Sequence, residues 1–121
     1  MQKVLKNIPD DRFAAYIVWL PMIRTDNRDA AVTRSTEFAD KRLSYFWDGD
    51  RMTGKLWQKV LNFSATAWDI YFLYGAETRW EKEPSLPEFW MHQLGVAQGM
   101  APMLNQEEFE AEARKMLAKI K

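Results

Sequence analysis

Few side chains in this sequence could carry out catalysis. Cysteine is absent from the 121 residues, so the chain has no thiol to act as a nucleophile, a redox group or a zinc ligand. His92 is the only histidine, and a Ser/His/Asp triad or an imidazole metal site would have to use it. We interpret His92 as a solvent-facing or hydrogen-bonded helix residue, which is the commoner role for a lone histidine.

The aspartates that follow two apolar segments are the other candidates. Asp26 comes after the first segment, and Asp48 and Asp50 come after the second. If both segments are parallel strands, their carboxyl ends meet at one edge, where carboxylates can bind a hard cation or act as acid and base. However, aspartate commonly caps a helix, and Asp-Gly is a frequent turn pair. We therefore favour capping by Asp26 and by Asp48 or Asp50, and we predict no metal and no cofactor.

Two arginines near a predicted helix start suggest an anion site. Arg24 and Arg28 flank the point where the helix should begin, and unpaired N–H groups at a helix start attract carboxylates and phosphates. The alternative is that these arginines pair with Asp26 and Asp29 on a solvated surface, as most such charge clusters do. We favour the ion pairs.

Six tryptophans are the most unusual feature of the composition. Trp19, Trp47 and Trp68 fall on predicted strands, and strands pack side by side. Their rings can therefore line an aromatic groove near Pro21 and Thr66, suited to an apolar ligand or a peptide. The alternative is that large rings fill the core of a small domain.

The other three tryptophans fit a core role at least as well as a binding role. Trp57 lies on the apolar stripe of a predicted helix, so we expect it in the core. Trp80 and Trp90 lie near an irregular segment, where exposure at an interface is as plausible as core packing.

The apolar spacing predicts the strands that position these residues. Continuous apolar residues over 13–20, ended by Pro21, predict a strand covered on both faces. Further strands are predicted over 43–47 and 68–74. After the last of these, Gly75 should form a tight turn into a pairing strand over 77–81.

Helices are predicted between the strands and at the end of the chain. Helical spacing of apolar residues places three of them, one after residue 26, one over about 50–62 and a short one over 85–94. The last helix should begin at Asn105, which has capping-box spacing to Glu108.

The predicted element order is β-α-β-α-β-β-α. A helix that links two strands most simply makes them parallel, whereas a hairpin is antiparallel. We therefore predict an α/β fold with one four-stranded mixed sheet flanked by helices, in a single domain over residues 1–121.

Two segments resemble the thioredoxin-like family. The segment Val18–Met22 (VWLPM) is similar to the first strand and redox loop of thioredoxins, and Thr66–Glu77 (TAWDIYFLYGAE) is similar to their Thr-Pro, strand and glycine turn. The resemblance implies a glutaredoxin-type core. Four short segments, 19–22 (WLPM), 46–48 (FWD), 67–75 (AWDIYFLYG) and 89–92 (FWMH), also resemble a group of uncharacterised bacterial thioredoxin-fold proteins. That resemblance implies a fold but no activity.

The sequence departs from this family at two positions that matter for chemistry. Residues 20–25 (LPMIRT) stand where the family has Cys-x-x-Cys, so dithiol exchange is impossible. Ala67 replaces the family's cis-proline, and we expect a trans bond there because a non-proline cis bond costs about 2.5–4 kcal/mol.

Charge and apolar patterning limit the partners. The 17 basic and 17 acidic residues give a formal net charge of zero, which disfavours binding to nucleic acid or an anionic membrane. The longest apolar run, over 13–23, contains a proline and falls short of the ~20 residues that span a bilayer. No secretory signal pattern is present, so we expect a cytoplasmic protein.

The loss of the thiols from a thioredoxin-like pattern, together with the aromatic excess, predicts a redox-inactive module. We expect it to bind a peptide, a small molecule or a partner protein. The predicted ligand-binding residues lie on the loop after the first strand, the end of the second strand and the start of the third: Trp19, Pro21, Met22, Arg24, Thr25, Asp26, Trp47, Thr66, Ala67 and Trp68.

Two alternatives remain open at this point. One is an enzyme that uses Asp26, Asp48 and His92 for acid/base or metal-assisted chemistry. The other is a homodimer that pairs through the predicted edge strands 43–47 or 77–81.

Overall fold

The computed structural model describes residues 1–121, which divide into two units, Met1–Thr53 and Gly54–Lys121. A short helix that the sequence analysis does not predict, α1 (Gln2–Asn7), precedes the elements of the predicted order. From the first strand onward the order is β-α-β-α-β-β-α, as predicted. The interpretation of 1–121 as a single domain stays a prediction.

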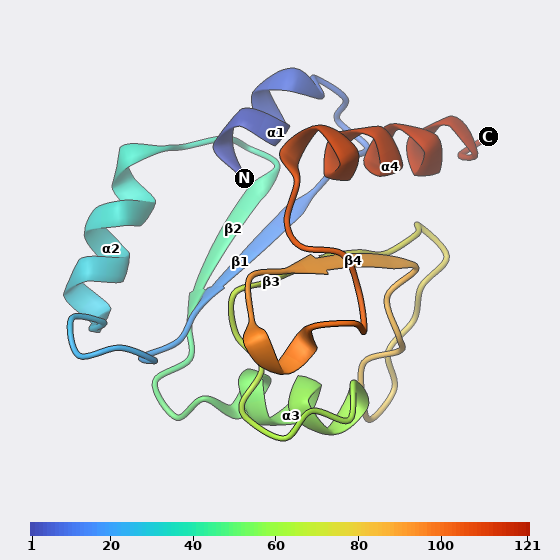
Figure 1. The fold of residues 1–121 in the computed structure, drawn as a ribbon. Helices are drawn as coiled ribbons and strands as arrows, with labels where there is room; N and C mark the ends of the chain where they lie inside the picture. The colour runs from blue at the N-terminus through green and yellow to red at the C-terminus, as the bar shows by residue number, and fades with distance from the viewer. The chain divides into compact units, whose positions relative to one another are not determined.

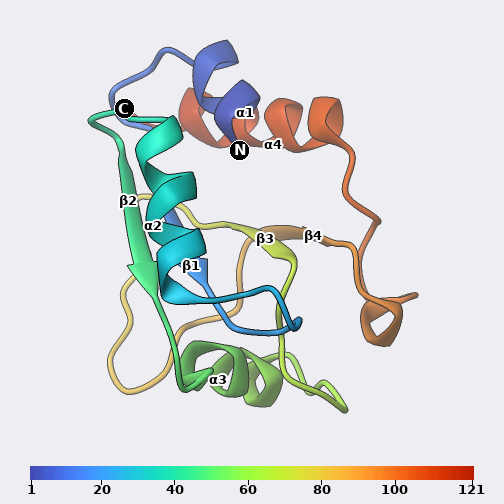
Figure 2. The same cartoon turned by 90° about the vertical axis from the view of Figure 1, so that its left-hand side faces the viewer.

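The first unit is built on two parallel strands, β1 (Ala15–Trp19) and β2 (Leu43–Trp47). Their register runs from Ala15 opposite Leu43 to Trp19 opposite Trp47. The helix α2 (Arg28–Glu37) connects them and lies along one face of the pair (Figures 1 and 2). The predicted parallel pairing through a helix is therefore confirmed. The prediction that the first strand is covered on both faces is wrong, because Tyr16 on β1 is 71% exposed.

Helix α1 is held by a contact with a residue far away in the sequence, which no local sequence pattern predicts. The guanidinium of Arg42 donates hydrogen bonds to the carbonyl oxygens of Leu5 and Ile8, and it pairs with the carboxylate of Asp40 at 2.7 Å. These carbonyls lie at the C-terminal end of α1, where backbone acceptors lack partners within the helix. Leu5 and Ile8 are buried beside them, so a six-residue helix becomes stable through tertiary contacts.

The second unit contains an antiparallel pair, β3 (Ile70–Leu73) and β4 (Phe89–His92). The third predicted strand is confirmed, but its predicted partner over 77–81 is wrong, because residues 74–88 form an irregular connection. The segment 77–81 carries three charged side chains, and Trp80 is its one large apolar residue. Glu88 closes the connection, since its carboxylate accepts the N–H of Gly75 at 2.8 Å.

The short helix predicted over 85–94 is also wrong. Phe89 and Trp90 belong to β4, where Met91 is fully buried. Leu94 precedes the turn of 3₁₀ helix η1 (Gly95–Ala97), and Leu86 is exposed in the irregular connection. Phe89 and Trp90 favour extended structure, and pairing with β3 satisfies their backbone groups. Periodicity alone does not separate a short buried strand from a short helix.

The remaining helices agree with the sequence analysis. Helix α3 (Met52–Val60) carries the predicted apolar stripe. Helix α4 (Gln106–Ala118) begins after Asn105, whose side chain accepts the N–H of Glu108 at 3.0 Å. The chain has no cis peptide bond, so the bond before Ala67 is trans, as expected. None of the helices combines the length and the apolar composition needed to cross a membrane.

The predicted four-stranded mixed sheet is not observed, because the strands form two separate sheets of two strands each. The two connections β1-α2-β2 and β3-loop-β4 set the pairing inside each sheet. A further pairing between the sheets would depend on residues far apart in the chain, and no local spacing in the sequence specifies it.

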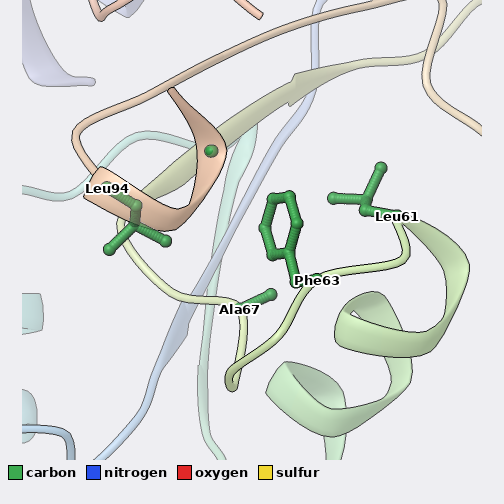
Figure 3. Packing of buried hydrophobic residues seen from close by; sticks show 5 residues of the cluster. Leu61, Phe63, Ala67 and Leu94 are labelled. Carbon is green, nitrogen blue, oxygen red and sulfur yellow. The ribbon is translucent and has the colours of Figure 1, made fainter. Parts of the chain in front are cut away.

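The second unit has an apolar cluster of Leu61, Phe63, Ala67, Leu94 and Ala97. Figure 3 shows four of these side chains, those of Leu61, Phe63, Ala67 and Leu94. Four half-buried hydrophobic residues pack against the cluster, namely Trp57, Ile70, Phe72 and Trp90. Trp57 therefore has the predicted core role, and Trp90 joins it. Trp80 is 51% exposed and touches Trp57 and Tyr74 edge-on.

Candidate functional site

A pocket of about 390 Å³ lies in the first unit, where the carboxyl ends of β1 and β2 meet the start of α2. Small-molecule sites commonly have volumes of about 300–1,000 Å³. The apolar part of its lining comes from both strand ends, the loop after β1 and one face of α2: Trp19, Trp47, Leu20, Ile23, Ala30 and Ala31. Polar lining residues are Thr25, Asp26, Asn27 and Arg34.

The two tryptophans of the pocket are placed by strand register. Trp19 and Trp47 are the last residues of β1 and β2 and are partners in the parallel pair. Neighbouring residues of paired strands project from the same face, so both rings line the pocket. The indole nitrogen Nε1 of Trp19 is buried and has no hydrogen-bond partner, which is uncommon for a buried donor.

Asp26 shapes the loop that forms one wall of the pocket. Its Oδ2 atom accepts hydrogen bonds from the N–H groups of Met22 and Ile23, both at 2.8 Å. The helix cap is Asn27, whose side chain accepts the N–H of Ala30 at 2.8 Å. The predicted capping by Asp26 is therefore wrong. α2 begins one residue later than that prediction requires, and the loop folds back onto the carboxylate.

Arg51 fixes the same loop from the other side. Its guanidinium donates two hydrogen bonds to the carbonyl oxygen of Pro21, at 2.9 and 2.6 Å. Arg51 has a φ of 57°, a left-handed conformation that is uncommon for a residue other than glycine. Pro21 and Met22 are half-buried in the loop and Arg24 is exposed, but the pocket lining includes none of these three. No local pattern in the sequence identifies Arg51.

Asp48 is occupied by helix capping, one of the roles predicted for it. Its carboxylate accepts the N–H groups of Met52 and Thr53 at 2.9 and 2.7 Å, and the hydroxyl of Thr53 at 2.5 Å. No group of three or more histidine, aspartate or glutamate side chains in the structure is placed to hold a metal ion. The carboxylates of Asp26 and Asp48 thus each serve local backbone structure.

His92 is fully buried on β4. Its Nδ1 accepts the N–H of Leu94 at 3.0 Å, so Nε2 carries the proton and donates to the carbonyl of Ala101 at 2.9 Å. The predicted hydrogen bonding is correct, whereas the predicted helix and the solvent-facing alternative are wrong. With both ring nitrogens bonded to backbone and no exposed surface, His92 holds the segment after β4 in place.

The other predicted ligand-binding residues belong to the second unit. Ala67 is buried in the apolar cluster of that unit, and its N–H donates to the carbonyl of Gly54 at 3.0 Å. Thr66 is half-buried and Trp68 is partly exposed. None of the three lines the pocket of the first unit.

The pocket therefore contains part of the predicted site and several residues that the sequence analysis misses. Four predicted residues line it, Trp19, Thr25, Asp26 and Trp47. Those missed are Leu20, Ile23, Asn27, Ala30, Ala31 and Arg34. The spacing of Ala30, Ala31 and Arg34 places them on one face of α2, but only the tertiary fold shows which face points to the strand ends.

The arginines near this site do not make the predicted ion pairs. Arg24 and Arg28 are exposed and pair with neither Asp26 nor Asp29. Arg34 has a side chain that is 71% exposed, and its Nη1 lies 3.5 Å from a carboxylate oxygen of Glu37. This distance is at the outer limit of a hydrogen bond, so most of the donors of Arg34 are open to other groups.

Comparisons of the chain with protein-family models, with curated proteins and with solved structures find no match.

Proposed function

We propose that this chain is a redox-inactive, thioredoxin-like binding module that takes a small molecule or a peptide side chain into the pocket of its first unit. The observation that carries the proposal is the pairing of Trp19 with Trp47 at the adjoining ends of β1 and β2, both of which line the pocket. Large rings beside a few polar groups are the usual lining of ligand pockets.

A fixed wall supports this proposal. The loop after β1 is tied by Asp26 to its own backbone and by Arg51 at Pro21. A loop held in one conformation loses less entropy when a ligand binds. Ile23, at 56% exposed, is a large apolar side chain of this wall that a ligand would cover.

The thioredoxin-like part of the proposal is supported by the element order. After α1 comes the strand-helix-strand unit, and a helix, an antiparallel strand pair and a final helix follow. Cysteine is absent, so the chain is not a thiol-disulfide oxidoreductase.

A fragment screen followed through the tryptophan side chains tests the binding function. The six indole N–H signals of the ¹⁵N-labelled protein are assigned by single substitutions, and a set of small aromatic and aliphatic compounds is added at millimolar concentration. We expect compounds that shift the signals of Trp19 and Trp47 and not that of Trp80, and we expect Ile23→Ser to weaken them. Absence of any such compound contradicts the proposal.

Ile23→Ser and a matched control separate loss of the pocket from general damage. Ile23 is exposed, so Ile23→Ser changes the wall with little cost in folding. Leu86, which is 67% exposed in the second unit, provides the control Leu86→Ser. Binding that is equally weakened by both substitutions would place the ligand elsewhere.

The homodimer has a separate observation in its favour. Tyr16 and Phe46 are exposed on paired strands and their ring centroids lie 6.3 Å apart, on the face opposite Trp19 and Trp47 by strand alternation. The outer edge of β2 is unpaired, but the segment 77–81 is not a strand and no longer supports this alternative. Light scattering after size-exclusion chromatography tests it, with Phe46→Ser as the variant expected to dissociate a dimer.

A further inference from the structure

The charge on the lining of the pocket distinguishes between ligand classes. Arg34 lies on the same face of α2 as Ala30 and Ala31, one turn beyond them, and all three line the pocket. A guanidinium has five N–H donors, and the one acceptor within hydrogen-bond distance of that of Arg34 is a carboxylate oxygen of Glu37, at 3.5 Å. A cation with unused donors thus borders an apolar space.

The two carboxylates at the strand ends accept backbone hydrogen bonds. The carboxylate of Asp26 accepts two backbone hydrogen bonds, and that of Asp48 accepts the N–H groups at the start of α3. Arg24 and Arg28 are exposed and make no ion pair. Bonds from N–H groups offset the negative charge of a carboxylate. Of the two charged residues that line the pocket, Asp26 and Arg34, Arg34 is therefore the one with most of its hydrogen-bonding groups unused.

We infer that the ligand of this pocket is an organic carboxylate with an apolar body, bound with its carboxylate on Arg34 and its body against Trp19, Trp47 and Ile23. The inference rests on the proposed function and names its substrate class. A planar guanidinium matches a carboxylate through two parallel hydrogen bonds, and the indole faces supply the contact area for the apolar part.

Three probes that share one phenyl ring and differ in charge test this inference. They are 3-phenylpropionate, the uncharged 3-phenylpropanamide and the phenethylammonium ion, each titrated while the indole signals of Trp19 and Trp47 are followed. We expect the carboxylate to bind more tightly than the amide, and the ammonium ion to bind most weakly. Arg34→Gln should weaken the carboxylate about five-fold and leave the amide unchanged.

Arg28→Gln is the matched control, because it removes the same charge from the same helix at a position that does not line the pocket. The affinity of this variant for 3-phenylpropionate should stay within about two-fold of that of the unchanged protein. The reason is that dissolved ions screen a charge that lies outside the pocket. If Arg28→Gln and Arg34→Gln weaken the binding of 3-phenylpropionate equally, the effect comes from the overall charge of the protein. That result would overturn the assignment of the carboxylate to Arg34.

The remaining outcomes separate this inference from the proposed function. If the amide binds as tightly as the carboxylate, or the ammonium ion binds best and Asp26→Asn abolishes the preference, the carboxylate class is wrong while the pocket still binds ligands. If none of the three probes shifts the signals of Trp19 and Trp47, both the carboxylate class and the proposed binding function of the pocket are wrong.

Discussion

The guanidinium of Arg51 donates two hydrogen bonds to a single acceptor, the carbonyl oxygen of Pro21, at 2.9 and 2.6 Å. The contact joins the loop after β1 to the residue just before α3, across 30 positions of sequence. It fixes the start of the loop, and Asp26, near the end of the same loop, lines the pocket. The shape of the candidate site thus depends on an arginine that lies outside its lining.

Replacement of Arg51 by asparagine should loosen this loop. Asparagine tolerates the left-handed backbone that position 51 adopts, so Arg51→Asn removes the guanidinium with little added backbone strain. We expect faster hydrogen exchange at the N–H groups of Met22 and Ile23 and a stability change below about 1 kcal/mol. The exposed loop residue Arg24 gives the control Arg24→Asn, and equal exchange in the two proteins would show that Arg51 does not hold the loop.

Removal of the Asp26 carboxylate should destabilise the first unit. In Asp26→Ala the N–H of Ile23 loses its acceptor and the N–H of Met22 keeps only the carbonyl oxygen of Leu20. We expect a loss of about 1–2 kcal/mol in urea unfolding. Asp50 is an exposed aspartate with no such bonds, so Asp50→Ala should change stability by less than about 0.5 kcal/mol. A stability for Asp26→Ala that matches Asp50→Ala would contradict the role given to this carboxylate.

His92 should matter for folding rather than for chemistry. His92→Ala leaves a cavity at a fully buried position. It also removes the hydrogen-bond partners of the N–H of Leu94 and the carbonyl of Ala101. We therefore expect the free energy of unfolding to fall by about 2–4 kcal/mol. Chemical denaturation followed by circular dichroism measures it. Gln98→Ala, at an exposed position nearby, is the control, and a wild-type midpoint for His92→Ala would refute the structural role.

Acid should weaken the contact that anchors α1. Hydrogen bonds from the side chain and backbone of Arg42 lower the pKa of Asp40 to about 2 from its ordinary value of 3.8. The unfolded chain therefore takes up this proton first as the pH falls. The stabilising contribution of Asp40 is complete above about pH 4 and is lost as the pH falls toward 2.

Thermal unfolding at a series of pH values measures this effect. In Asp40→Asn the midpoint should be lower than in the unchanged protein at pH 6, and the two curves should approach each other by pH 2. A difference that stays constant over this range would mean that the pKa of Asp40 is not lowered by folding.

High pH should destabilise the second unit when the hydroxyl of Tyr71 ionises. Burial, and then the nearby negative charge of Asp69, raise the pKa of Tyr71 to about 12, and its hydroxyl donates to Asp69 Oδ1 at 3.0 Å. A raised pKa means that the folded protein holds the proton more tightly than the unfolded chain does. The contribution to stability is complete below about pH 10 and is lost as the pH rises toward 12.

The absorbance of ionised tyrosine, recorded from pH 9 to 12.5, checks this prediction. In Tyr71→Phe the step that titrates near pH 12 should be missing, and the fall in stability above pH 10 should be shallower. If the four tyrosines of the unchanged protein all ionise near pH 10, the prediction for Tyr71 fails.

The sequence by itself determined the elements whose signals are local. The apolar run ended by Pro21 gave β1, the pair Asn105 and Glu108 gave the start of α4, and the absence of cysteine excluded thiol chemistry. The connection of β1 to β2 through one helix determined their parallel pairing. Each of these follows from residues that are close in the chain, where spacing and backbone preference act directly.

Only the tertiary structure decided the features that depend on distant partners. It assigned β4 rather than 77–81 as the partner of β3, divided the strands between two sheets, and bonded both nitrogens of His92 to backbone. It also brought one face of α2 to the strand ends and thereby added Arg34 to the pocket. These outcomes depend on which groups bury together, and the free energy of burial depends on the whole fold rather than on local spacing.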